Sequence, residues 1–105
     1  MDTLETVINN YLEYCNSQKC LDEKTLKAYR IDLRQFSEQI SIINIAEITS
    51  KTLEQYIARL HEQYKPKTVK RKIASVKALF HYLEYKDIID HNPFSKILIH
   101  FREPV

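Results

Sequence analysis

Glycine is absent from this 105-residue sequence, and proline occurs only three times. Without glycine the chain cannot contain the glycine-rich loops that cradle phosphates, the dinucleotide-binding fingerprint or the nucleophile elbow of hydrolases. Tight β-hairpin turns also need residues with positive φ, a role that glycine fills most readily. These absences exclude several enzyme classes and predict an all-α chain.

Cysteine is almost as scarce, since Cys15 and Cys20 are the only two. They lack the C-x-x-C spacing and the histidine partners of a zinc site, and we expect no disulfide framework. Reduced thiols of this kind are typical of cytoplasmic proteins. We therefore expect neither a bound metal nor any other cofactor.

Long hydrophobic runs are missing as well. No apolar segment approaches the roughly 18 residues needed to span a bilayer, and no charged-then-apolar leader opens the chain. The apolar share of 44% and the charged share of 29% are enough to bury the core of one domain and keep it in solution. We therefore expect a single soluble, cytoplasmic domain with no membrane partner.

Acidic residues are rare in one part of the chain. Residues 1–62 contain seven basic and ten acidic side chains, whereas residues 65–86 contain seven basic ones and a single acid, Glu84. An exposed helix ordinarily mixes both signs, because opposite charges three or four residues apart stabilise it. The imbalance favours a surface that binds a polyanion, with an ordinary solvated helix face as the alternative.

Four segments show the periodicity of amphipathic helices. They begin after Thr3, after Asp22, near Thr49 and at Pro66, and these residue types suit helix starts. The apolar positions of each segment fall on one face, which predicts a helical bundle with a shared core. The predicted core residues are Leu4, Val7, Ile8, Tyr11, Leu12 and Cys15; Leu26, Tyr29, Leu33, Phe36 and Ile40; Leu53, Tyr56, Ile57 and Leu60, with Tyr64 as a further candidate; and Val69, Ile73, Val76, Phe80 and Leu83.

Two apolar segments lie outside these helices. Residues 42–48 contain four isoleucines, and we expect a loop whose isoleucines fill the end of the bundle, because no strand partner is evident. The Asn92-Pro93 pair marks a break, since a residue before proline avoids the helical region. Phe94, Ile97, Leu98 and Phe101 then predict a short and strongly apolar fifth helix.

The basic residues of the second and fourth helices are predicted to face away from the core, at about 100° per residue. Lysine and arginine suit phosphates, and threonine hydroxyls at helix starts suit phosphates or base edges, although each threonine could equally cap its helix. Ala74 and Ala78 would let the fourth helix approach a large partner closely, while Lys72 flanks the apolar stripe and is a weaker candidate. The candidate DNA-binding residues are Lys24, Thr25, Lys27 and Arg30 on the second helix, and Lys67, Thr68, Lys70, Arg71 and Lys77 on the fourth. We expect the two helix starts to lie side by side, so that their cations form a single concave patch.

The order of several motifs resembles the core-binding domain of the tyrosine recombinases, the phage-integrase family. The first half is Asp22-x-x-Thr25-x-x-x-Tyr29-x-x-x-Leu33-x-x-Phe36, and the second is Thr68-Val69-x-Arg71-x-Ile73-x-Ser75-x-x-x-Leu79-Phe80-x-Tyr82-Leu83. The resemblance implies a compact bundle of four to five helices, SAM-like, over residues 1–93, which grips one side of a DNA duplex with its second and fourth helices. Residues 94–105 would form the short apolar helix and the start of a linker to a catalytic domain.

The resemblance also implies what the domain binds and what it does not do. Its partners would be double-stranded DNA and other recombinase protomers on that DNA, for a chain that is monomeric when isolated and associated with the nucleoid. The family's catalytic motifs do not occur in this sequence, so no catalysis is expected from the chain by itself. The alternative function is a helical protein–protein interaction module that uses the fifth helix and Ile31, which the helical count places on the polar side of the second helix.

Overall fold

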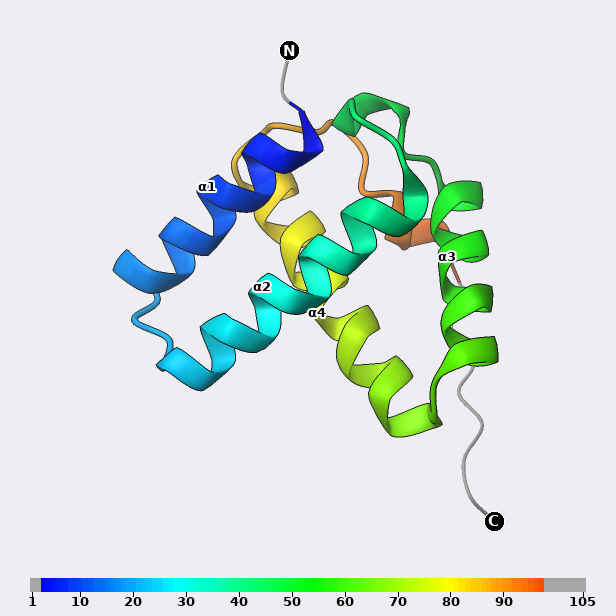
Figure 1. The fold of residues 1–105 in the computed structure, drawn as a ribbon. Coiled ribbons are helices and arrows are strands. Elements are labelled where there is room, and N and C mark those ends of the chain that lie inside the picture. The colour runs from blue at the N-terminus through cyan, green and yellow to red at the C-terminus, as the bar shows by residue number, and fades with distance from the viewer. Residues whose placement is uncertain (1–2, 98–105) are drawn as a thin grey trace.

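Four α-helices make up most of the structure, in the order that the sequence predicts. The computed structural model describes residues 3–97 (Figure 1). The helices are α1 (Leu4–Ser17), α2 (Glu23–Ile40), α3 (Ser50–Gln63) and α4 (Pro66–Tyr85), with short 3-10 helices η1 (Ile45–Glu47) and η2 (Pro93–Lys96). Over the described residues, extended pairing is limited to an isolated bridge between Thr3 and Asn44. The predicted all-α fold is confirmed.

The starts of the helices differ in how they are capped. Thr3, Asp22 and Thr49 each accept a hydrogen bond from the backbone N–H three residues further on, at the starts of α1, α2 and α3. Hydrogen bonds from the side chain and backbone of Thr25 lower the pKa of the Asp22 carboxyl, which favours its charged form as the cap. The N-cap of α4 is Lys65, which makes no such side-chain bond. α4 is thus the one α-helix among the described elements without a side-chain cap at its start.

The core forms where α4 packs against the other three helices. Leu33 and Phe36 of α2 and Leu79 of α4 are fully buried, and the ring of Phe36 meets that of Tyr56 edge-on at 4.9 Å between centroids. Burial raises the pKa of Tyr56, and likewise of Tyr11 in α1, so both phenols stay protonated in the core. The predicted apolar stripes are confirmed: most of their members are buried, and Leu12, Leu26, Tyr29, Ile40 and Ile57 pack against the core while partly exposed. Tyr64, the further candidate of the third stripe, is exposed and does not belong to the core.

The isoleucine-rich segment between α2 and α3 is only partly as predicted. Ile45 and Ile48 are buried and fill the end of the bundle, but Ile43 is 73% exposed. The carbonyl oxygen of Ile43 accepts a hydrogen bond from the backbone N–H of Leu4 at 2.7 Å, beside the Thr3–Asn44 bridge. The segment therefore does have an extended partner, Thr3 just before α1, and this backbone pairing leaves the Ile43 side chain in solvent.

The segment after α4 differs from the predicted fifth helix. Pro93–Lys96 form one 3-10 turn, capped by the side chain of Asn92, and Ile97 already has extended backbone. Phe94 is buried, with its ring 5.6 Å from that of Phe80, so the apolar residue at the start of this segment completes the core. The prediction of a regular helix that starts at Phe94 is therefore wrong for residues 94–97. The remainder of that prediction, at Leu98 and Phe101, lies outside the described residues.

Candidate nucleic-acid interface

A buried polar cluster marks the place where α2 and α4 cross. Asp32 of α2 is fully buried, and its Oδ1 accepts hydrogen bonds from Arg71 Nη2 at 3.2 Å and from Lys72 Nζ at 3.1 Å. Its Oδ2 accepts one from Ser75 Oγ at 2.9 Å. The Lys72 side chain is almost wholly buried, whereas that of Arg71 is 57% exposed. One carboxylate thus joins the two helices and holds an arginine at the surface.

Lys72 is part of this cluster and does not belong to the basic surface. Its Nζ donates to Asp32 and to Gln35 Oε1, and lies 4.9 Å from the centre of the Tyr64 ring. A buried ammonium needs such partners, because leaving water without them is costly. The role of Asp32 as its counter-ion was not predicted from the sequence. A signal was present, since Asp32 lies three residues after Tyr29 and four before Phe36, on the side of α2 that faces the bundle.

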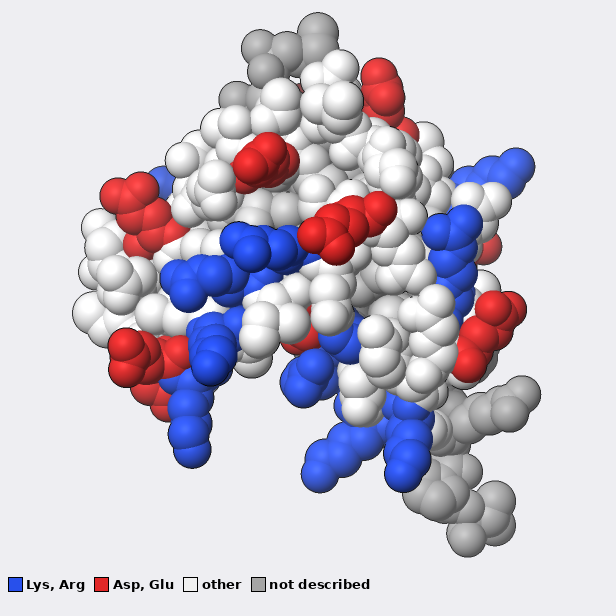
Figure 2. Space-filling model, viewed as in Figure 1, with Lys and Arg blue, Asp and Glu red and all other residues white. Residues whose placement is uncertain are grey.

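The predicted lysines and arginines are all exposed. In Figure 2, blue side chains cover much of the lower half of the molecule, over the first halves of α2 and α4, and acidic side chains lie mostly above and beside them. Thr25 and Thr68, each two or three residues inside its helix, are half-buried. The exposed members of the predicted set are Lys24, Lys27 and Arg30 on α2, and Lys67, Lys70, Arg71 and Lys77 on α4.

The two helix starts do not lie side by side, contrary to the prediction. In Figure 1 the first turn of α2 lies at the lower left and the first turn of α4 at the lower right. The helices meet further along, where Asp32 in the middle of α2 contacts Arg71 and Ser75 of α4. Packed helices generally cross at an angle, so their ends diverge from the point of contact. The exposed cations therefore form two separate groups and not one concave patch. We call these groups the two arms of the interface: one is formed by the exposed cations of α2 and the other by those of α4.

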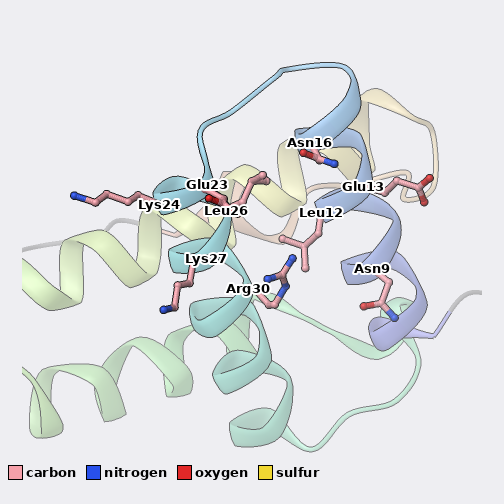
Figure 3. Close-up of a pocket in the computed structure, with 9 residues that line it drawn as sticks. All are labelled: Asn9, Leu12, Glu13, Asn16, Glu23, Lys24, Leu26, Lys27 and Arg30. Atoms are coloured by element: carbon pink, nitrogen blue, oxygen red, sulfur yellow. The ribbon is translucent and has the colours of Figure 1, made fainter.

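A groove between α1 and α2 is lined by all three predicted cations of α2, Lys24, Lys27 and Arg30 (Figure 3). Its volume is about 820 Å³. In Figure 3 the guanidinium of Arg30 points toward Leu12 of α1, while Lys24 and Lys27 extend away from the groove. The lining combines acidic with basic side chains, so the groove favours neither an anionic nor a cationic ligand. It consists of Asn9, Leu12, Glu13, Asn16, Glu23, Lys24, Leu26, Lys27 and Arg30.

Two other kinds of site are missing from residues 3–97. No group of three or more His, Cys, Asp or Glu side chains in this range could hold a metal ion. No helix in the same range combines the length and the apolar character needed to cross a membrane. Cys15 is buried and Cys20 exposed, and both are free thiols. The crossing of α2 and α4 and the exposed cations on these two helices are the candidate site.

Comparison with known proteins gives one family. Residues 8–86 match the family model described as phage integrase, N-terminal SAM-like domain. The chain is 65% identical over 105 residues to a tyrosine recombinase of Agathobacter rectalis, an alignment that covers 100% of this chain and 34% of the relative. It is 30% identical over 101 residues to the tyrosine recombinase XerC of Oceanobacillus iheyensis, covering 92% of this chain and 33% of the relative. No solved structure matches significantly.

The matches cover most of this chain but only part of each relative. The chain spans about a third of the length of the curated relatives that it matches. The matched residues 8–86 contain α2, α3, α4 and most of α1, and with them the crossing at Asp32. The chain therefore belongs to the phage integrase N-terminal SAM-like domain family.

Proposed function

We propose that this chain is the DNA-binding, non-catalytic domain of a tyrosine recombinase, and that α2 and α4 bind one side of the duplex at the recombination site. Residues 1–93 would form the DNA-binding unit together with the buried Phe94 of η2, and the residues after η2 would begin a linker. The observation that carries the proposal is the set of seven exposed lysines and arginines on two helices that cross at Asp32. The family supports it, because the curated relatives are named tyrosine recombinases.

The start of α4 adds an independent argument. Lys65 and Lys67 stand at the N-terminus of this helix, where no acidic residue is present in the first turn and no side chain caps the backbone. The helix dipole makes this end electropositive, so cations there cost about 0.3–1 kcal/mol each. A phosphate group would relieve that repulsion and accept hydrogen bonds from the uncapped backbone N–H groups of Lys67 and Thr68. The arrangement is unfavourable for the free protein and favourable for a complex with a polyanion.

The tyrosines of the core are unsuited to nucleophilic chemistry. Burial raises the pKa of Tyr11 and Tyr56, whereas a nucleophile needs its pKa lowered or a neighbouring base. We infer that strand cleavage and joining belong to another part of the recombinase. The protein partners would then be other recombinase protomers that are bound to the same DNA, close to the nucleoid.

A second candidate function is protein–protein interaction through α2. Ile31 is 45% exposed, as the helical count predicts. It lies one turn after Lys27, on the same exposed side as the cations, so a protein docked there would compete with DNA. A single exposed isoleucine is common on protein surfaces, which is why DNA binding is the stronger candidate.

Titration of a fluorescently labelled duplex with the 105-residue chain tests the proposal. Because affinity would come mainly from phosphates, we expect weak binding, with a Kd of about 1–100 μM at physiological salt, and a steep loss as salt increases. Fluorescence anisotropy at low and at physiological salt measures both quantities. Failure to bind at low salt, or binding that does not respond to salt, would contradict DNA binding and leave the protein–protein candidate.

Giving α4 a capping side chain should stabilise the protein and weaken its hold on DNA. Lys65→Asp is expected to raise the free energy of unfolding by about 0.5–1 kcal/mol, since aspartate caps the helix and suits its dipole. The same change places a negative charge where a phosphate would lie, so affinity for the duplex should fall. Urea denaturation and anisotropy measure the two effects. Lys65→Ser is the matched control, because serine caps without a charge and should weaken DNA binding less.

A further inference from the structure

We propose that Arg71 reads a guanine in the major groove, and that the buried carboxylate of Asp32 holds its guanidinium in the orientation that this requires. The inference rests on the proposed DNA binding by α2 and α4. It goes further by naming the base that is read, the residue that reads it and the residue that positions the reader.

The carboxylate of Asp32 is a fixed support. It is fully buried and accepts hydrogen bonds from three donors of α4, at Arg71, Lys72 and Ser75. A buried carboxylate with bonds to both oxygens cannot change its orientation without breaking one of them. Arg71 Nη2 is bonded to this support at 3.2 Å. The guanidinium plane is therefore restrained before any DNA arrives.

The remainder of the Arg71 side chain is available to a large partner. The side chain is 57% exposed, and the bond to Asp32 uses one of its several N–H donors. Lys72 shares the negative charge of Asp32, so the cluster of two cations and one carboxylate keeps a net positive charge. A restrained, planar and positively charged fork pairs best with two adjacent acceptors.

Guanine is the base that presents such a pair. Its major-groove edge has the N7 and O6 acceptors, whereas adenine and cytosine place an amino donor on theirs. Gln35, also exposed beside the crossing, turns its Oε1 toward Lys72 Nζ, so its amide nitrogen adds a donor to the surface. Because these groups are all hydrogen-bond donors, they favour guanine over adenine and cytosine, which carry a donor on the same edge.

The surface around Arg71 allows α4 to come close to a groove. Ala74 and Ala78 follow Arg71 by three and seven residues, which places them on the same side of the helix, and Ala74 is exposed. Their methyl groups add little bulk between the backbone and a partner. Lys67, one turn before Arg71, is exposed and suits a flanking phosphate. Base reading and backbone contact would thus come from consecutive turns.

The test begins with sites that the 105-residue chain selects from a library of random duplexes. We expect the selected sites to share a guanine. Replacing that guanine with 7-deazaguanine, which lacks the N7 acceptor, should weaken binding about tenfold, as for one good arginine–guanine pair. Replacing a neighbouring adenine with 7-deazaadenine should have little effect.

Two variants assign this preference to residues. Arg71→Lys keeps the charge but loses the planar fork, and it should distinguish the two versions of the site much less than wild type does. Asp32→Ala combined with Lys72→Met removes the support without leaving a lone buried charge or changing the net charge. That double variant should retain the salt dependence of wild-type binding and lose most of the preference for guanine, an effect that a purely structural role would not produce. Arg59→Lys is the matched control, because Arg59 is an exposed arginine that bonds to a carbonyl oxygen on another helix.

Each result separates the inference from the proposed function. Salt-dependent binding with no loss on 7-deazaguanine would overturn guanine reading and leave DNA binding intact. A full preference in Arg71→Lys would assign the reading to another residue, and a full preference in the folded double variant would overturn the positioning role of Asp32. No binding to any duplex would overturn both the inference and the proposed function.

Discussion

Asp32→Ala is expected to lower the free energy of unfolding by about 3–5 kcal/mol, because it leaves a buried charge without its counter-ion. The carboxylate is fully buried and accepts hydrogen bonds from Arg71, Lys72 and Ser75. Without it, the ammonium of Lys72 stays enclosed beside Gln35 and the ring of Tyr64, neither of which carries a charge. A domain of this size has a total stability of about 5–15 kcal/mol, so the reduction is a large share. Urea denaturation followed by circular dichroism measures it.

Removing both charges distinguishes the cost of an unpaired ammonium from that of the missing hydrogen bonds. Asp32→Ala/Lys72→Met is expected to recover much of the stability, since replacing both members of a buried pair with apolar groups is often neutral. The difference between the double variant and the sum of the single variants gives the coupling between the two residues. Glu38→Ala removes an exposed acid from the same helix and should change stability by no more than about 0.5 kcal/mol. If the double variant were destabilised as much as the sum of the single ones, the pair would not be coupled.

The core could be predicted from the sequence because helical periodicity is a local property. Residues three and four apart share a face of a helix whatever else the chain does. Leu33, Phe36 and Leu60 are therefore buried as expected. Asp32 shows the limit of this reasoning, because the helical count places it toward the bundle but does not name its partner. That partner, Lys72, lies 40 residues away.

The arrangement of the candidate site could not be predicted from residue spacing within each helix, for a similar physical reason. Which side chains of α2 are exposed follows from their spacing, but the angle at which α2 crosses α4 depends on the side chains packed between them. The diverging helix starts and the turn of Arg30 toward α1 are consequences of that packing. Ile43 is exposed for another non-local reason, the pairing of residues 43 and 44 with Leu4 and Thr3 at the start of α1.

Reversing one charge on each arm of the interface is expected to have the largest effect on DNA binding. Lys27 and Lys67 are exposed, one on α2 and one on α4, on either side of the crossing. Lys27→Glu/Lys67→Glu should weaken duplex binding about 100-fold at low salt, since two attractive interactions with phosphates become repulsive. The slope of log affinity against log salt should fall by about 2, because two fewer phosphates are neutralised. Anisotropy titrations over a range of salt concentrations measure both changes.

The matched control is Lys51→Glu/Lys86→Glu, which changes the net charge by the same amount. Lys86 is the C-cap of α4, 19 residues after Lys67 in the first turn and about 28 Å away from it. Exposed charges at that separation are screened, because the Debye length is about 8 Å at physiological salt. The control variant should therefore bind nearly as wild type does. Equal weakening in the two double variants would mean that DNA responds to overall charge and not to this face, and weakening only in the control would place the interface elsewhere. Weakening confined to Lys27→Glu/Lys67→Glu, with the full fall of about 2 in the salt slope, requires both arms to touch the same duplex, because loss of one arm alone accounts for a fall of about 1.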